Sequence, residues 1–163
     1  MKDQYSHSKG KQNNQKPEAS IDNELPTYRE TGYKNEDGEY RIDFIVDYPM
    51  RIAEMISDRT KFKIADTENN NTQIRKFFEL VRNVETSLQL EKINMGQALI
   101  EVNRLRPLVE NAKKGGKITQ CFVDFININL DKVKTAEDLV FFAKHFEAVI
   151  GFSKKDTKGG NRR

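Results

Sequence analysis

The chain has a single cysteine, no tryptophan and no long apolar run. Its 163 residues include Cys121 and only two histidines, His7 and His145. One cysteine excludes an intramolecular disulfide and a cysteine-cluster metal site, and two separated histidines are too few for a metal site made of histidines. No apolar run has the length of a membrane span, and the N-terminus lacks the hydrophobic core of a signal peptide. The sequence therefore predicts a cytoplasmic protein without a metal, a cofactor or a membrane contact.

Bulky apolar residues are also scarce at both ends of the chain. Residues 1–38 are polar and interrupted by Gly, Pro, Asn and Asp, and residues 154–163 are basic and contain glycine. Such segments bury too little apolar surface to offset the entropy of ordering. We therefore expect a disordered polar extension over residues 1–38, one helical bundle domain over residues 39–153 and a flexible basic tail over residues 154–163.

The middle of the chain has helical periodicity. Residues 40–46 alternate apolar and polar side chains, but a lone strand has no partner, so we expect this segment to lie extended on a bundle. Apolar side chains at helical spacing predict helices over about 48–57, 72–88, 92–105 and 118–133, with a last helix after Thr135. The predicted fold class is all-α, a compact bundle of four to five helices without a sheet.

Proline, glycine and capping residues mark the expected helix boundaries. Pro107 cannot donate to the preceding turn, so the helix before it must kink or restart. Residues 107–114 then form a short restart that ends at the Gly115-Gly116 pair. Candidate N-caps for the other helices are Asp47, Asn71 or Thr72, and Thr135 with Asp138 as its capping-box partner.

Some apolar side chains do not fit a single core stripe. In the last helix, Phe141 and Phe152 lie off the main stripe. The helix over residues 118–133 is apolar on two sides, so it is either central in the bundle or half core and half interface. Its second apolar line is a candidate surface for self-association as well as for the core, and consists of Val123, Ile126, Leu130 and Val133.

Basic residues are clustered although the net charge is only +3. Arg75 and Lys76 lie in the first turns of a helix, where the helix dipole usually favours carboxylates. Further cations lie on the same helix, near Pro107 and around the double-glycine turn: Arg82, Arg104, Arg106, Lys113, Lys114 and Lys117. Such clusters can bind a phosphate backbone without reading bases, whereas most charge runs are simply solvated faces.

No catalytic constellation can be assembled from the sequence. The segment KKGGK lacks the spacing and context of a phosphate-binding loop. Cys121 and His145 could form a nucleophile and base pair, but a buried cysteine is most often a small hydrophobe. His145 lies among core positions of the last helix and is more simply a packing residue. We therefore predict no enzymatic activity.

Three motifs then resemble a known family. NNTQIRKFFELV, LRPLVENAKK and DLVFFAKHFEAVIGFSKKDTKGG are similar, in order and spacing over about residues 66–160, to segments of the small subunit of the type III-A CRISPR effector (Csm) complex. The resemblance implies an all-helical protein without catalytic activity. It also implies that several copies stack as an inner filament, beside the backbone subunits and the large subunit, along the channel where CRISPR RNA pairs with single-stranded target RNA.

The resemblance also suggests which residues bind RNA. Gln73, Arg75 and Lys76 match the most specific motif, and Lys113 and Lys114 stand where the family has a turn followed by arginine. The main hypothesis is therefore an antiviral RNA-binding subunit that uses sequence-independent backbone contacts. The alternative is a helical homo-oligomeric assembly adaptor whose cations are ordinary surface.

Overall fold

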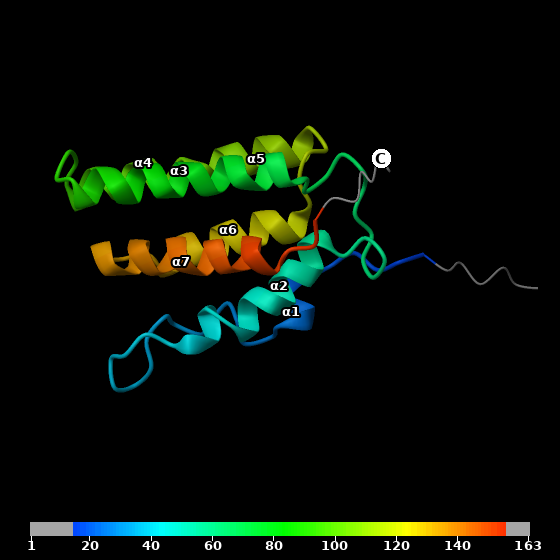
Figure 1. The fold of residues 1–163 in the computed structure, drawn as a ribbon, viewed down its shortest axis with the longest axis horizontal. Coiled ribbons are helices and arrows are strands. Elements are labelled where there is room, and N and C mark those ends of the chain that lie inside the picture. The colour runs from blue at the N-terminus through cyan, green and yellow to red at the C-terminus, as the bar shows by residue number, and fades with distance from the viewer. Residues whose placement is uncertain (1–14, 156–163) are drawn as a thin grey trace, which may run out of the picture.

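The computed structural model describes residues 15–155, and all regular elements in this range are helices (Figure 1). The all-α prediction is confirmed. A short helix, α1 (Ile21–Glu24), and a 3-10 turn, η1 (Ile42–Phe44), precede α2 (Asp47–Ser57), α3 (Asn71–Gln89), α4 (Met95–Asn103), α5 (Leu105–Lys114), α6 (Gln120–Lys132) and α7 (Ala136–Phe152). The described range contains more helices than the four to five predicted, because the restart near Pro107 is a separate helix, α5, and because α1 lies in the segment predicted to be disordered.

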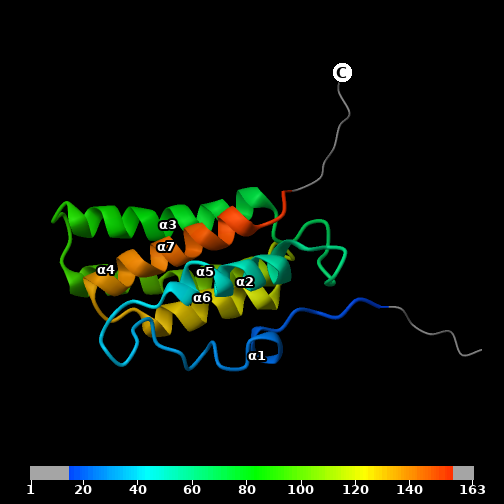
Figure 2. The ribbon, with the colours of Figure 1, turned by 60° about the horizontal axis from the view of Figure 1, so that its bottom comes forward.

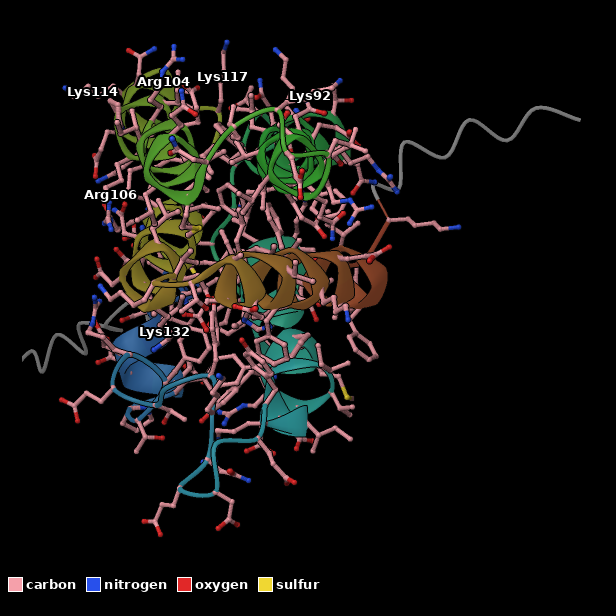
Figure 3. All side chains as sticks on the ribbon, turned by 90° about the vertical axis from the view of Figure 1, so that its left-hand side faces the viewer. Lys92, Arg104, Arg106, Lys114, Lys117 and Lys132 are labelled. Atoms are coloured by element: carbon pink, nitrogen blue, oxygen red, sulfur yellow. The ribbon has the colours of Figure 1, made fainter. Side chains whose placement is uncertain are left out.

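The helices form three layers, which are clearest along the long axis of the molecule (Figure 3). One outer layer contains α3 beside α4 and α5, which follow one another almost in line (Figure 1). The middle layer contains α6, which packs on α5, and α7, which packs on both α3 and α2. The other outer layer contains α1, η1 and α2. The two middle helices are therefore covered from both sides.

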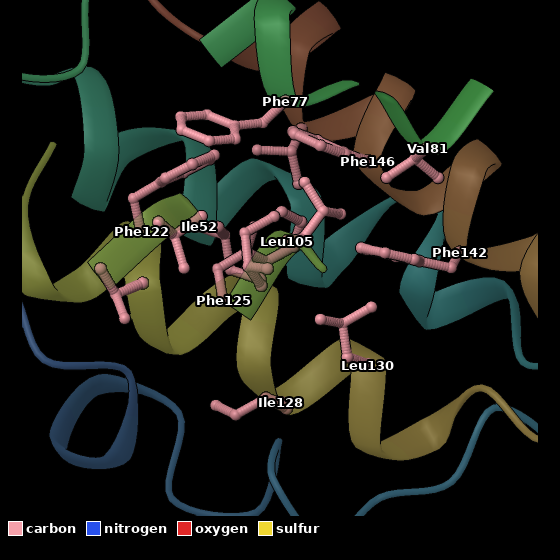
Figure 4. Packing of buried hydrophobic residues seen from close by; sticks show 14 of the residues in the cluster. Ile52, Phe77, Val81, Leu105, Phe122, Phe125, Ile128, Leu130, Phe142 and Phe146 are labelled. Atoms are coloured by element: carbon pink, nitrogen blue, oxygen red, sulfur yellow. The ribbon is translucent and has the colours of Figure 1, made fainter. Parts of the chain in front are cut away.

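Aromatic side chains of the middle layer fill the core (Figure 4). The rings of Phe142 and Phe146 stack with centroids 6.0 Å apart and planes 11° apart. Phe125 meets Phe146 edge-on at 5.3 Å, and Phe77 of α3 contacts Phe122 at 5.6 Å. Offset and edge-on pairs of this kind are favourable beyond the area that they bury. The core is therefore continuous from the outer α3 layer into α6 and α7.

The central position of α6 decides the role of its second apolar line. All four members are buried within a single chain: Val123 and Ile126 are 0% exposed, Val133 is 2% exposed and Leu130 is 3% exposed. These residues belong to the core and are not available for self-association, the other role that the sequence left open. A helix covered by layers on both sides needs two apolar lines, and the sequence pattern alone could not tell this from an interface.

Residues 15–46, which we call the strap, are ordered, so the prediction of disorder over residues 1–38 is wrong for residues 15–38. The strap runs along the side of α6 and α7 away from α3 (Figure 2). The large apolar side chains of residues 15–38 are Ile21, Leu25, Tyr28 and Tyr33, and all four are buried. These side chains are few, but all of them belong to the core of the bundle. Their burial holds residues 15–38 in an ordered conformation. Residues 1–14 and 156–163 lie outside the described residues.

A buried polar network holds the strap on the middle layer. Tyr33 Oη donates to Asn129 Oδ1 at 2.8 Å, and Asn129 Nδ2 donates to Tyr28 Oη at 2.8 Å. Tyr28 Oη is 2.7 Å from His145 Nε2, and His145 Nδ1 contacts the Phe44 carbonyl oxygen. The carbonyl can only accept, so Nδ1 carries the proton and Nε2 accepts from Tyr28. Every buried donor in this network therefore has a partner, as buried polar groups require.

Local boundaries agree with the sequence to within a few residues. Thr135 and Asp138 form the predicted capping box. Asn70, one residue before the predicted cap, caps α3, and Val46 precedes α2 in place of Asp47. Residues 42–44 form η1 and are not extended as predicted. The break between α4 and α5 falls at Arg104, so that Pro107 lies in the first turn of α5, where its missing N–H costs little.

Candidate nucleic-acid interface

Asn69 joins three helix ends at one end of the bundle. Its side-chain nitrogen donates to the Ile56 carbonyl oxygen at 3.1 Å and to Thr119 Oγ1 at 2.9 Å, while its side-chain oxygen accepts from the Thr119 N–H at 3.0 Å. Its own N–H donates to the Lys117 carbonyl oxygen at 2.9 Å. The end of α2, the start of α3 and the start of α6 are therefore fixed together.

The end of α7 reaches the same place. The Lys154 N–H donates to Ser57 Oγ at 2.8 Å, and its ammonium lies 2.7 Å from a carboxylate oxygen of Asp58. The bonds from Lys154 and Thr60 lower the pKa of Asp58 to about 2, so this carboxylate stays charged and holds the α7 end at neutral pH. The ends of α2, α5 and α7 and the starts of α3 and α6 are therefore neighbours.

This end of the bundle carries most of the predicted RNA-binding cations. We call the resulting surface the basic end, formed by exposed side chains on α3, on and after α5, and after α7: Arg75, Lys76, Lys113, Lys114, Lys117 and Lys155. None of the six forms an ion pair with a carboxylate among residues 15–155, and Lys113 bonds to the neutral side chain of Gln120. Figure 3 shows Lys114 and Lys117 on the outer α5 side of the molecule.

The other predicted cations are paired elsewhere along the helices. Arg82 lies 2.8 Å from Glu85, Arg104 lies 3.0 Å from Glu101, and Arg106 lies 2.7 Å from Asp131. An arginine that already bonds a carboxylate must give up that contact to bind phosphate. We therefore expect these three arginines to contribute less to RNA binding than the basic end does.

Gln73 has a local structural task at the start of α3. Its N–H donates to the capping oxygen of Asn70 at 3.0 Å, and its side chain is only half-buried. Because the cap is a neutral asparagine and the first turn carries no carboxylate, no negative charge there offsets the positive end of the helix dipole. Arg75 and Lys76 add to that positive potential. The first turns of α3 are therefore suited to hold an anion.

Cys121 and His145 do not form a nucleophile and base pair. Burial raises the pKa of the Cys121 thiol to about 12, so it stays protonated and unreactive at neutral pH. Both ring nitrogens of His145 are engaged, by Tyr28 and by the Phe44 carbonyl. Within residues 15–155 no three metal-ligating side chains come together. No helix of this range is long and apolar enough to cross a membrane.

Residues 47–158 match the family model described as Csm2 Type III-A. This segment is about two thirds of the 163 residues and includes every helix from α2 to α7. The chain belongs to the Csm2 Type III-A family. The Csm2 family is that of the small subunit of the type III-A CRISPR effector complex, as the motif around Gln73 indicated. Neither a curated protein nor a solved structure matches the chain.

Two features of this Csm2-family chain were missed by sequence reasoning. The strap lies before the matched segment, and its contacts with α6 and α7 span about a hundred residues, so no local pattern could reveal them. Asn69 had a weak signal, since it begins a run of three asparagines. Its backbone φ of 53° is left-handed, a conformation that asparagine tolerates better than most residues.

Proposed function

We propose that the chain is a non-catalytic small subunit of a type III-A CRISPR antiviral effector complex that binds CRISPR RNA and single-stranded target RNA through its basic end. The observation that carries the proposal is the group of exposed cations there without a carboxylate partner among residues 15–155. A cation of this kind can contact an RNA phosphate and release counterions without breaking an internal ion pair. Membership of the Csm2 family supports the same role.

The mode of binding that we propose is independent of base sequence. The basic end offers ammonium and guanidinium groups and the first turns of α3 and α6, all of which favour phosphate over base edges. We further propose that several copies stack as an inner filament in the cytoplasm, in contact with the backbone subunits, the large subunit and each other. Aligned copies would place many weak phosphate contacts along one RNA, which raises avidity.

The proposal is tested by reversing charge at the basic end and at a matched position. We expect Arg75→Glu combined with Lys76→Glu to weaken binding of single-stranded RNA about tenfold or more, measured by fluorescence anisotropy at low salt. The control is Lys134→Glu combined with Lys144→Glu, which changes net charge equally at exposed cations away from this end. Equal effects of the two double variants would mean that binding is diffuse and that the basic end is not the interface.

A second candidate function, the assembly adaptor without RNA binding, is favoured by one observation. An apolar groove of about 380 Å³ lies between α3 and the α4–α5 pair, and its lining includes Leu80, Val84, Ile93, Leu105 and Leu108. Exposed apolar grooves often mark protein contacts. Under this alternative the Arg75 and Lys76 reversal leaves partner binding unchanged and wild-type protein does not bind RNA at low salt, so the same titration separates the two functions.

A further inference from the structure

Phe152 is the one phenylalanine whose ring is exposed. All ten phenylalanines lie within residues 15–155, and nine are buried or half-buried, whereas Phe152 is 46% exposed. Phe141, the other phenylalanine off the core stripe, is covered by the strap, with Tyr33 and Tyr40 rings 5.0 and 4.5 Å away. A single exposed apolar side chain is common on protein surfaces. The position of Phe152 is what distinguishes it.

The ring lies at the basic end and on a fixed support. Phe152 is the last residue of α7, and the next residue, Ser153, lines the same small pocket as Arg75. The Ser153 hydroxyl donates back into the helix, and the ion pair between Lys154 and Asp58 holds the chain beyond it. The backbone that carries the exposed ring is therefore fixed at the basic end, one residue from the pocket that Arg75 lines and three residues from Lys155.

Resting on the proposed RNA-binding function, we infer that Phe152 is a stacking platform for an unpaired base of single-stranded RNA whose phosphates lie on the basic end. A cationic surface combined with an aromatic ring is the arrangement by which proteins bind single strands without sequence preference, because every base has a π-face. A base within a duplex is stacked on its neighbours and cannot reach the ring. The site therefore takes single-stranded RNA in preference to duplex.

The absence of tryptophan from the chain allows a direct test. In the full chain carrying Phe152→Trp, all tryptophan fluorescence comes from the proposed site. We expect oligo(A) and oligo(U) to quench it, and an RNA duplex of the same length to leave it nearly unchanged. The matched control is Leu90→Trp, because Leu90 is 60% exposed just beyond the far end of α3 from Arg75. Its fluorescence should not respond to any of these RNAs.

A second variant separates stacking from charge. Phe152→Ala should weaken single-strand binding by about 5- to 100-fold and leave the salt dependence of binding unchanged, whereas Phe152→Tyr should retain binding. RNA binding by Phe152→Trp without quenching, or equal affinity of Phe152→Ala and wild type, would overturn the inference while leaving the proposed function intact. Failure of wild-type protein to bind RNA at low salt would overturn both.

Discussion

At the scale of single residues, Asn69 combines a backbone conformation with a side-chain role. Its left-handed φ turns the chain into α3, and its amide group bonds both the end of α2 and the cap of α6. The residue is 5% exposed, so groups released by its removal cannot all find water. The geometry of the basic end therefore depends on a residue that carries no charge.

We predict that Asn69→Ala lowers the free energy of unfolding by about 3 kcal/mol, because three side-chain hydrogen bonds are lost and alanine is strained at this φ. Asn69→Gly should cost about 1 kcal/mol less, since glycine adopts the left-handed region freely. Urea unfolding measures both. The control Asn83→Ala, at an exposed position of α3, should change stability by less than about 0.5 kcal/mol. Equal stability of wild type and Asn69→Ala would contradict the joining role.

Single residues also decide which cations are paired with a carboxylate and which are not. The sequence could place Arg75, Lys76 and the lysines near the double glycine in clusters, because clustering is a local property. It could not show that Arg106 meets Asp131 across two helices. Arg82 and Arg104 each have an acidic residue three positions away, a spacing at which ion pairs form within one helix and which the sequence itself displays.

At the scale of elements, the helices could be predicted and the strap could not. Helix periods, the Thr135 cap and the effect of Pro107 depend on residues within a few positions of each other. The order of the strap depends on contacts such as Tyr33 with Asn129, 96 residues apart. Amino-acid composition is an average over a segment. It therefore could not reveal that the four large apolar side chains of residues 15–38 are all buried in the core. The strap is therefore a tertiary feature, held by a buried polar network.

The histidine in that network makes stability depend on pH. Burial lowers the pKa of His145 from an ordinary 6.5 to about 3. Between these values the unfolded chain binds a proton that the folded chain does not, so stability falls as pH falls through this window. We predict a loss of about 2 kcal/mol in the free energy of unfolding from pH 7 to pH 5, measured by urea unfolding.

The variant His145→Gln isolates this effect. It should be less stable than wild type at pH 7, but its stability should change little between pH 7 and pH 5, because glutamine does not titrate. The Asp58 carboxylate does not interfere, since its pKa of about 2 lies well below this range. The same pH slope in the variant as in wild type would show that another group is responsible and that His145 is not buried under the strap.

At the scale of the whole molecule, antiparallel packing collects charge that the sequence disperses. The start of α3 and the end of α7 are more than seventy residues apart in the chain, yet they and the double-glycine turn meet at one end of the bundle. Three arginines elsewhere on the surface, Arg82, Arg104 and Arg106, are paired with carboxylates. A protein of net charge only +3 can thus gather several exposed cations at one end of its bundle.

The most direct test of this account is the salt dependence of RNA binding. Affinities for a single-stranded RNA are measured by anisotropy over a series of salt concentrations, for wild type and for Arg75→Gln combined with Lys76→Gln. Each lost phosphate contact should reduce the magnitude of the slope of log affinity against log salt by about 0.7, so we predict a reduction of about 1.4 in the double variant. An unchanged slope would contradict the claim that the basic end binds the RNA backbone.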